Sequence, residues 1–135
     1  MRIVFDTNVL ISSTLWDESI AQKLLFKLIV LDAKIFTSIP IISEYKNVLK
    51  RDFDYIEEEI ESILEKIISF LTVIQVAEEV DIVKKDPDDN KIMECALSSS
   101  SEYIVTYDKH LLDIETFKGI KIVKPQGLLR ILGEV

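Results

Sequence analysis

Short apolar segments recur along this chain and are separated by longer segments with helical periodicity. The apolar segments lack the alternation of polar and apolar residues that is typical of a strand with one solvated face. Strands that are buried on both faces belong to parallel sheets that helices cover. The sequence therefore predicts an α/β fold, a three-layer α/β/α sandwich with a central parallel sheet of four to five strands. The predicted strands are residues 2–5, 34–37, 72–76, 103–106 and 120–123.

The segments between the predicted strands show helical stripes and helix start signals. Pro40 and Pro125 suit the first position of a helix, and Asp54 with Glu57 fits an N-cap and a capping box. The chain has 135 residues and no internal repeat or linker, so we expect a single domain over residues 1–135. The predicted helices are residues 17–31, 40–50, 54–71, 88–99 and 125–132.

The composition indicates a folded protein of a reducing compartment. Hydrophobic residues make up 48% of the chain, which is enough for a core and too many for a disordered chain. Cys95 is the only cysteine, so no internal disulfide can form. Residues 1–6 contain too short an apolar run for a signal peptide, and residues 24–31 are too short to cross a bilayer. We therefore expect a soluble cytoplasmic protein without a membrane partner.

Two acidic residues follow predicted strands closely. Asp6 ends the run of residues 2–5, and Asp108 follows residues 103–106 after one residue. Ligands of open α/β sheets bind at the carboxyl ends of the strands. The two carboxylates are therefore predicted to face the same crevice if their strands are neighbours.

Two further acids lie on the apolar faces of predicted helices. Glu44 is three residues after Ile41 and four residues before Val48. Asp89 lies three residues before Ile92. Residues at these spacings share a helix face. A carboxylate on the buried side of a helix is costly unless it is paired or bound to a metal ion.

Four converging carboxylates would repel one another by roughly 4 kcal/mol per pair at about 4 Å and an effective dielectric of about 20. A divalent cation relieves this repulsion, and hard oxygen ligands select Mg²⁺ or Mn²⁺ over zinc. One or two such ions can activate a water molecule and stabilise a displacement at phosphorus. The predicted catalytic and metal-binding residues are therefore Asp6, Glu44, Asp89 and Asp108.

Each acid also has a purely structural explanation that the sequence leaves open. Asp6 and Asp108 could cap the helix or turn that follows them, and Glu44 could form a salt bridge at the rim of its helix face. Asp86 and Asp88 fit a helix N-cap and an acidic first turn around a proline. Both Asp86 and Asp88 are therefore left out of the core of the predicted site.

Several other functional motifs are absent from the sequence. No Gly-rich phosphate loop or dinucleotide fingerprint follows the first predicted strand, and no G-x-S-x-G nucleophile motif occurs. His110 and Cys95 do not form a zinc-binding pattern. The stretch from Asp86 matches a calcium loop only at its start, because Lys91 replaces the required glycine. We expect Cys95 to be a small core residue and His110 to lie on the surface.

The acidic residues lie in segments that resemble the PIN domain family. The opening Ile3-Val4-Phe5-Asp6-Thr7-Asn8-Val9-Leu10 is similar to the start of a PIN domain, and Ser43-Glu44 stands in the helix after the second predicted strand. The segments Asp86-Pro87-Asp88-Asp89-Asn90 and Val105-Thr106-Tyr107-Asp108 make the resemblance specific. Their order and spacing cover nearly the whole chain. The subgroup that the chain resembles most is the toxin-like (VapC-type) prokaryotic PIN proteins.

The resemblance implies a Mg²⁺- or Mn²⁺-dependent endoribonuclease that hydrolyses RNA phosphodiester bonds. It also implies the toxin of a toxin–antitoxin pair, with an antitoxin protein as partner, and a homodimer. The site positions of the family correspond to the acids Asp6, Glu44, Asp89 and Asp108, the supporting residues Asn8 and Thr106, and the further acid Asp86.

The net charge of −8 is unusual for a nucleic-acid binder, which normally presents a positive field to its ligand. The four site acids account for half of this charge, and two divalent ions would offset that half. Much of the remainder is expected on one solvated face of the helix around residues 57–65, which could instead face a basic antitoxin segment. The candidate phosphate contacts are Lys46 and Lys109, with Lys50, Arg51 and His110 near the predicted site.

The sequence leaves two rival functions open. One is a phosphatase or phosphotransferase with Asp6 as the nucleophile, although Asn8 stands where a second acid is expected. The other is a non-catalytic, receiver-like binding module, for which Glu44 would be dispensable.

Overall fold

The computed structural model describes residues 1–77 and 90–133 of the chain. Within these residues the strands form one sheet in the order β3-β2-β1-β4-β6-β5. Neighbouring strands are parallel except β5 and β6, which are antiparallel. The strands are β1 (Arg2–Phe5), β2 (Lys34–Ser38), β3 (Leu71–Ile74), β4 (Tyr103–Val105), β5 (Thr116–Phe117) and β6 (Ile120–Val123).

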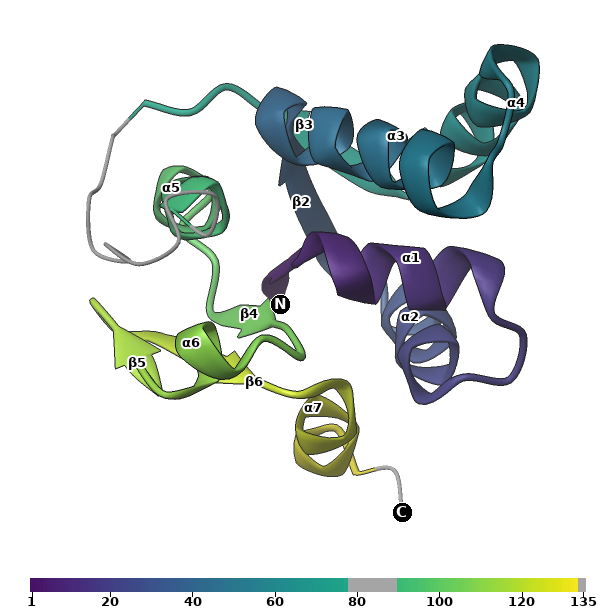
Figure 1. The fold of residues 1–135 in the computed structure, drawn as a ribbon. Coiled ribbons are helices and arrows are strands. Elements are labelled where there is room, and N and C mark those ends of the chain that lie inside the picture. Colours follow the sequence, from purple (N-terminus) through teal and green to yellow (C-terminus); the bar gives the residue numbers. More distant parts are fainter. Residues whose placement is uncertain (78–89, 134–135) are drawn as a thin grey trace.

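Helices cover both faces of the sheet (Figure 1). Helix α5 lies on one face, while α1, α2 and α7 lie together on the other face. This arrangement confirms the predicted α/β/α sandwich with a mainly parallel sheet. The helices of the described residues are α1 (Thr7–Leu15), α2 (Ile20–Val30), α3 (Ile39–Phe53), α4 (Glu57–Ile68), α5 (Asn90–Ser98), α6 (Lys109–Leu112) and α7 (Pro125–Ile131).

The two central strands are buried because helices cover both of their faces. Residues 3–5 of β1 and residues 104–105 of β4 are fully buried. The two strands pair in parallel, with Phe5 opposite Val105. The pairing continues beyond β1, since the backbone N–H of Asp6 donates to the Val105 carbonyl at 2.9 Å. The condition under which Asp6 and Asp108 would face the same crevice is therefore met, because their strands are neighbours and the carboxyl ends lie side by side.

The sheet of the described residues has one strand more than the four to five that the sequence predicts. Strand β5 is two residues long and forms a hairpin with β6. Lys118 and Gly119 form the turn and both have positive φ, 49° and 85°. Two positive φ values match a turn type that favours tight hairpins, and glycine adopts such a value without strain. A strand of two residues is too short to show any periodicity, so pattern reasoning could not find it.

The predicted capping box at Asp54 and Glu57 is wrong. Helix α3 continues to Phe53, and Asp54 ends it in the left-handed conformation with φ 55°. Helix α4 starts two residues later than the predicted box, and the Ile56 backbone N–H donates to the Glu59 side chain at 3.0 Å. Glutamates at positions 57, 58 and 59 allow a Glu three residues after the N-cap in more than one register, and the length of α3 decides between these registers.

Helix α1 has no counterpart among the predicted helix ranges, and three acids named from the sequence lie outside the described residues. Helix α1, which Asp6 precedes, has apolar or small residues on every face, so it shows no amphipathic stripe that could be recognised. Asp86, Asp88 and Asp89 lie outside the described residues. None of the helices within the described ranges is long and apolar enough to cross a membrane.

Candidate active site

Asp6 lies at the carboxyl end of β1 and caps helix α1. It is only 6% exposed. Its Oδ1 accepts a hydrogen bond from the Thr7 backbone N–H at 2.7 Å, and its Oδ2 accepts one from the Thr106 hydroxyl at 2.6 Å. The cap interpretation of Asp6 is therefore correct, and it does not exclude a role in the site. The two bonds fix the orientation of the carboxylate.

Thr106 connects Asp6 to Asp108. It is fully buried directly after β4. Its hydroxyl donates to Asp6 and accepts a hydrogen bond from the Asp108 backbone N–H at 2.9 Å. Asp108 is half-buried, and its Oδ1 accepts a bond from the His110 backbone N–H at 2.7 Å, which caps α6. The two strand-end acids are thus joined through one threonine.

Glu44 joins this network from helix α3. The Thr7 hydroxyl donates to Glu44 Oε1, and the Lys91 Nζ atom of α5 lies 3.0 Å from Glu44 Oε2. The side chains of Lys91 and Glu44 are 15% and 32% exposed, so this ion pair is partly screened from water. Glu44 therefore lies at the edge of the buried face of α3 and points toward α1 and α5. Residues from four elements meet at this point of the fold.

The carboxylates of the network interact electrostatically. Burial raises the pKa of Asp6, and the negative charges of Glu44 and Asp108 raise it further. The hydrogen bonds from Thr106 and Thr7 lower the pKa of Asp6 and offset part of this effect. The charged form of Asp6 is therefore held at a net cost, which a nearby cation would reduce.

The donor set fits a hard divalent cation. A carboxylate oxygen that accepts one hydrogen bond keeps a second lone pair for another partner, and carboxylates are preferred ligands of Mg²⁺ and Mn²⁺. Within residues 1–77 and 90–133, no three acidic, histidine or cysteine side chains form a ready-made metal cluster. Because Asp89 lies outside these residues, the described acids Asp6, Glu44 and Asp108 provide part of the predicted site.

The candidate phosphate contacts lie on the helices beside the network. Lys109 follows Asp108 directly, and its Nζ lies 3.7 Å from Asp113 of the same helix. The Nζ of Lys46 lies 4.0 Å from Glu61 of α4. Such solvent-exposed pairs contribute about 0–1 kcal/mol, so they can give way to a phosphate.

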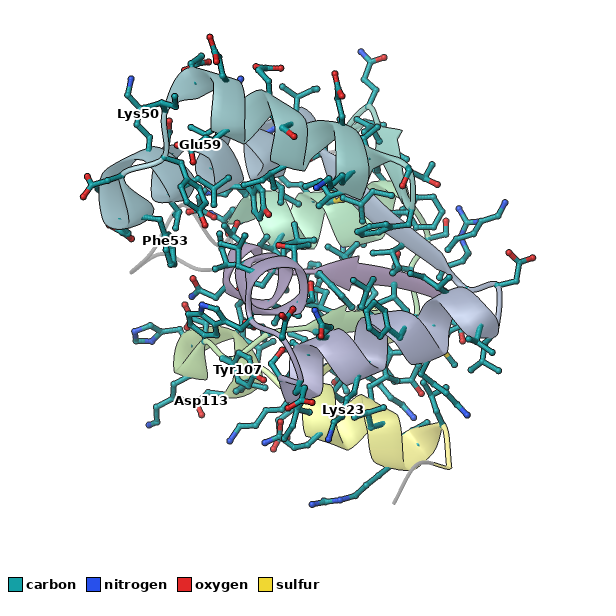
Figure 2. All side chains as sticks on the ribbon, turned by 90° about the vertical axis from the view of Figure 1, so that its right-hand side faces the viewer. Lys23, Lys50, Phe53, Glu59, Tyr107 and Asp113 are labelled. Carbon is teal, nitrogen blue, oxygen red and sulfur yellow. The ribbon has the colours of Figure 1, made fainter. Side chains whose placement is uncertain are left out.

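Three other basic residues named from the sequence are exposed. Lys50 lies beside Glu59 where α3 meets α4, apart from Tyr107 and Asp113 around α6 (Figure 2). Arg51 forms a bidentate pair with the neighbouring Asp52, at 2.8 and 3.1 Å. His110 is exposed on α6, as predicted.

Two smaller expectations can be compared with the structure. Cys95 is fully buried, and its burial raises the pKa of its thiol to about 12, so the prediction of a core residue is confirmed. Asn8, a predicted supporting residue, is exposed in the first turn of α1. Thr7 is the residue of that turn whose side chain contacts Glu44.

Lys91 is the site residue that the sequence reasoning missed. From the sequence, Lys91 stands out only as the residue that breaks a calcium loop. A signal was present, because Lys91 stands two residues after Asp89 at the start of a helix whose face carries the predicted acid. Its pairing with Glu44 could not be seen, since the two residues are 47 positions apart and belong to different helices.

A family model described as the PIN domain matches residues 2–110. The match covers most of the chain and includes Asp6, Glu44, Lys91 and Asp108. The chain belongs to the PIN domain family. PIN domains are nucleases, so this PIN domain is a hydrolase that acts on nucleic acids. That assignment favours a nuclease over the phosphotransferase and receiver-like alternatives.

Two solved structures share the fold of this PIN domain. One is the crystal structure of VapBC2 from Rickettsia felis bound to a DNA fragment from the VapBC2 promoter. It matches with a TM-score of 0.67 and 14% sequence identity, over 90% of this chain and 97% of that chain. The structure of PAE2754 from Pyrobaculum aerophilum matches with a TM-score of 0.58 and 19% identity, over 98% of this chain and 90% of that chain. No curated protein matches the sequence.

Proposed function

We propose that this PIN domain protein is a Mg²⁺- or Mn²⁺-dependent endoribonuclease that hydrolyses RNA phosphodiester bonds. The observation that carries the proposal is the buried Asp6 carboxylate, whose pKa is raised by burial and by the charges of Glu44 and Asp108. A divalent cation beside Asp6 would relieve this electrostatic cost. The nuclease assignment of the family supplies the reaction class.

The acids would share the work of holding the ions and ordering the water. Asp6, Asp89 and Asp108 would bind one or two ions directly. Glu44 would be a further ligand or would orient the attacking water. A bound Mg²⁺ or Mn²⁺ supplies a water of lowered pKa and neutralises charge that develops on the phosphate.

The neighbouring residues of the chain hold these acids in place. Thr106 fixes the Asp6 carboxylate, and Thr7 fixes Glu44 through its hydroxyl. Lys91 restrains the second oxygen of Glu44. Preorganised side chains of this kind reduce the rearrangement that is needed when substrate binds.

The proposed ion binding is tested by thermal melts of the wild type and Asp6→Asn, with and without Mn²⁺. Mn²⁺ should raise the melting temperature of the wild type, since a ligand at 100 times its Kd stabilises the folded state by about 2.7 kcal/mol. Asp6→Asn should gain much less. Equal gains for both proteins would contradict metal binding at Asp6.

Melting the same two proteins without metal, at several pH values, tests the raised pKa of Asp6. Because the pKa of Asp6 is raised in the folded state, its stabilising contribution is present at low pH and is lost as the pH rises through the folded pKa. Asp6→Asn removes this dependence. The variant should therefore melt above the wild type at neutral pH, and the difference should shrink toward a pH of about 4.

Lys91→Met tests the restraint on Glu44, with Lys91→Arg as the matched variant that keeps the charge. The methionine variant should lose about 1–3 kcal/mol of the free energy of unfolding, between the values for exposed and buried ion pairs, and about tenfold in cleavage rate. Lys91→Arg should keep most of both. A methionine variant with wild-type kcat would show that Lys91 has no role in the site.

Lys46 and Lys109 are proposed to contact RNA phosphates. Each lysine replaced by Gln should lower the slope of log affinity against log salt by about 0.7, the value for one contact with a single strand. The affinity is measured on an Asp6→Asn background, so that RNA is not cleaved. Lys34→Gln is the control, because Lys34 is the first residue of β2 and lies at the end of the strand away from the candidate site. An unchanged slope would remove that lysine from the interface.

The toxin role in a toxin–antitoxin pair is proposed for the same protein, acting in the cytoplasm as a homodimer with an antitoxin partner. It is supported by the toxin-like sequence resemblance and by the fold shared with VapBC2. A toxin of this kind should arrest the growth of a bacterial host, and the arrest should require Asp6.

A further inference from the structure

Helix α2 is apolar on two faces. Ala21, Leu24, Leu25 and Leu28 are buried in the core. A second set of apolar residues points outward: Ile20, Phe26 and Val30 are 45%, 56% and 80% exposed. The outward side of a surface helix is normally polar, but here large apolar side chains lie among the polar residues Lys23 and Lys27. These outward apolar side chains are candidates for contact with another molecule.

This outward face forms one wall of a groove against helix α7, with a volume of about 840 Å³. In Figure 2, α2 lies along α7, and Lys23 is labelled beside the seam between them. The apolar lining includes Phe26 and Val30 from α2 and Leu129 from α7. The volume lies within the usual range of ligand-binding pockets, and an exposed apolar patch with a polar rim is typical of an interaction site.

The rim of the α2–α7 groove is basic, although the whole chain carries a net charge of −8. Lys23, Lys27 and Arg130 line it, and none of its described lining residues is acidic. Lys23 and Arg130 are exposed on opposite helices, and neither has an ion-pair partner among the described residues. The groove is therefore complementary to a ligand that is both apolar and negatively charged.

The chemistry of the groove selects among occupants. A second copy docked symmetrically on this face would place one basic rim against another, and like charges repel. The phosphates of a nucleic-acid strand could meet the basic rim, but the strand offers no aliphatic side chains to cover Val30 and Leu129. An amphipathic helix fits both features, because its apolar residues fill the groove and its flanking acids reach the rim.

We propose that the α2–α7 groove binds an amphipathic helix of a partner protein, with Asp or Glu residues that pair with Lys23 and Arg130. The proposal does not depend on the nuclease site, since its residues belong to other elements of the fold. The partner helix would carry apolar residues spaced three or four positions apart, with acidic residues beside them.

The proposal is tested with a displayed library of 14-residue amphipathic helices, in which each flanking position is Glu, Lys or Gln. Sorting against the full-length protein should enrich Glu over Lys at least threefold at the flanking positions. One enriched peptide is then labelled, and its affinity is measured by fluorescence anisotropy. Phe26→Ser and Val30→Ser should each weaken binding at least tenfold, and Lys23→Glu combined with Arg130→Glu should do the same.

Ile56→Ser is the matched control, because Ile56 is also an exposed apolar residue, at 60%, but precedes α4. It should change the affinity less than twofold, and all variants should keep the wild-type melting temperature. Failure to enrich any peptide, or binding that the groove variants do not change, would overturn the proposal.

Two further measurements separate the other occupants. Sedimentation of the wild type that shows self-association, lost in Val30→Ser, would assign the groove to a second copy and overturn the proposal. Binding to phosphatidylglycerol vesicles, without binding to any enriched peptide, would assign it to a membrane surface and also overturn the proposal.

Discussion

Asp6→Asn is expected to abolish metal-dependent RNA cleavage while the fold survives. The substitution removes one negative charge and keeps the size of the side chain. Asn caps helices as well as Asp does, so the bond from the Thr7 backbone N–H can remain. The proposed ion, however, loses its most buried carboxylate. Because even the outer partners of metal ligands contribute 10–100-fold, we expect the cleavage rate to fall by more than about 100-fold.

The measurement is cleavage of a labelled RNA in Mn²⁺, together with circular dichroism to check the fold. Asp32→Asn is the matched control, since Asp32 is exposed in the turn before β2, at the other end of the strands. In a bacterial host, induction of the wild type should arrest growth, and induction of Asp6→Asn should not. An Asp6→Asn protein that cleaves RNA as fast as the wild type would refute the assignment of Asp6. A wild type that leaves growth unchanged would contradict the toxin role alone.

Thr106→Val should reduce both stability and activity, because the hydroxyl of Thr106 serves two acids at once. Valine has nearly the same shape, so the packing around this fully buried position should be kept. The variant loses a charge-assisted bond to Asp6 and leaves the Asp108 backbone N–H without its acceptor. Leaving such buried groups unpaired costs about 1–3 kcal/mol. Asp6 would also lose a bond that lowers its pKa, so its pKa should rise further.

Thr106→Ser is the matched control, since it keeps the hydroxyl and removes only a methyl group. It should retain most of the activity, whereas Thr106→Val should lose about tenfold or more in kcat. Chemical denaturation gives the free energy of unfolding for each variant. If the valine and serine variants have equal kcat and equal stability, the hydroxyl does not organise the site.

The sequence carried enough local information to predict the layered fold and three acids that the structure brings into one network. Asp6 and Asp108 were found because each follows a short apolar run, and the ends of such runs meet at one edge of a parallel sheet. Glu44 was found from its place beside the apolar stripe of a helix. These signals depend on residues a few positions apart, which is the range over which periodicity can be seen.

Lys91 and the bounds of α3 and α4 were not found for a different reason. The ion pair between Lys91 and Glu44 joins two helices that are distant in sequence, and no local pattern marks such a contact. The capping register near Asp54 was ambiguous because the end of α3 depends on its packing. Asp89, which the sequence places in the site, lies outside the described residues and stays a prediction.

The four acids of the candidate site therefore rest on different observations: Asp6, Glu44 and Asp108 lie in the described network, and Asp89 is placed by the sequence alone. The sequence by itself determined the α/β class and the position of Asp6 at a strand end, because these follow from local hydrophobic patterns and residue spacing. Only the tertiary structure decided that Thr106, 100 residues further along the chain, donates to Asp6, and that Lys91 pairs with Glu44. Contacts between distant segments depend on the strand order and on how helices pack against the sheet, and neither is encoded in a short stretch of residues.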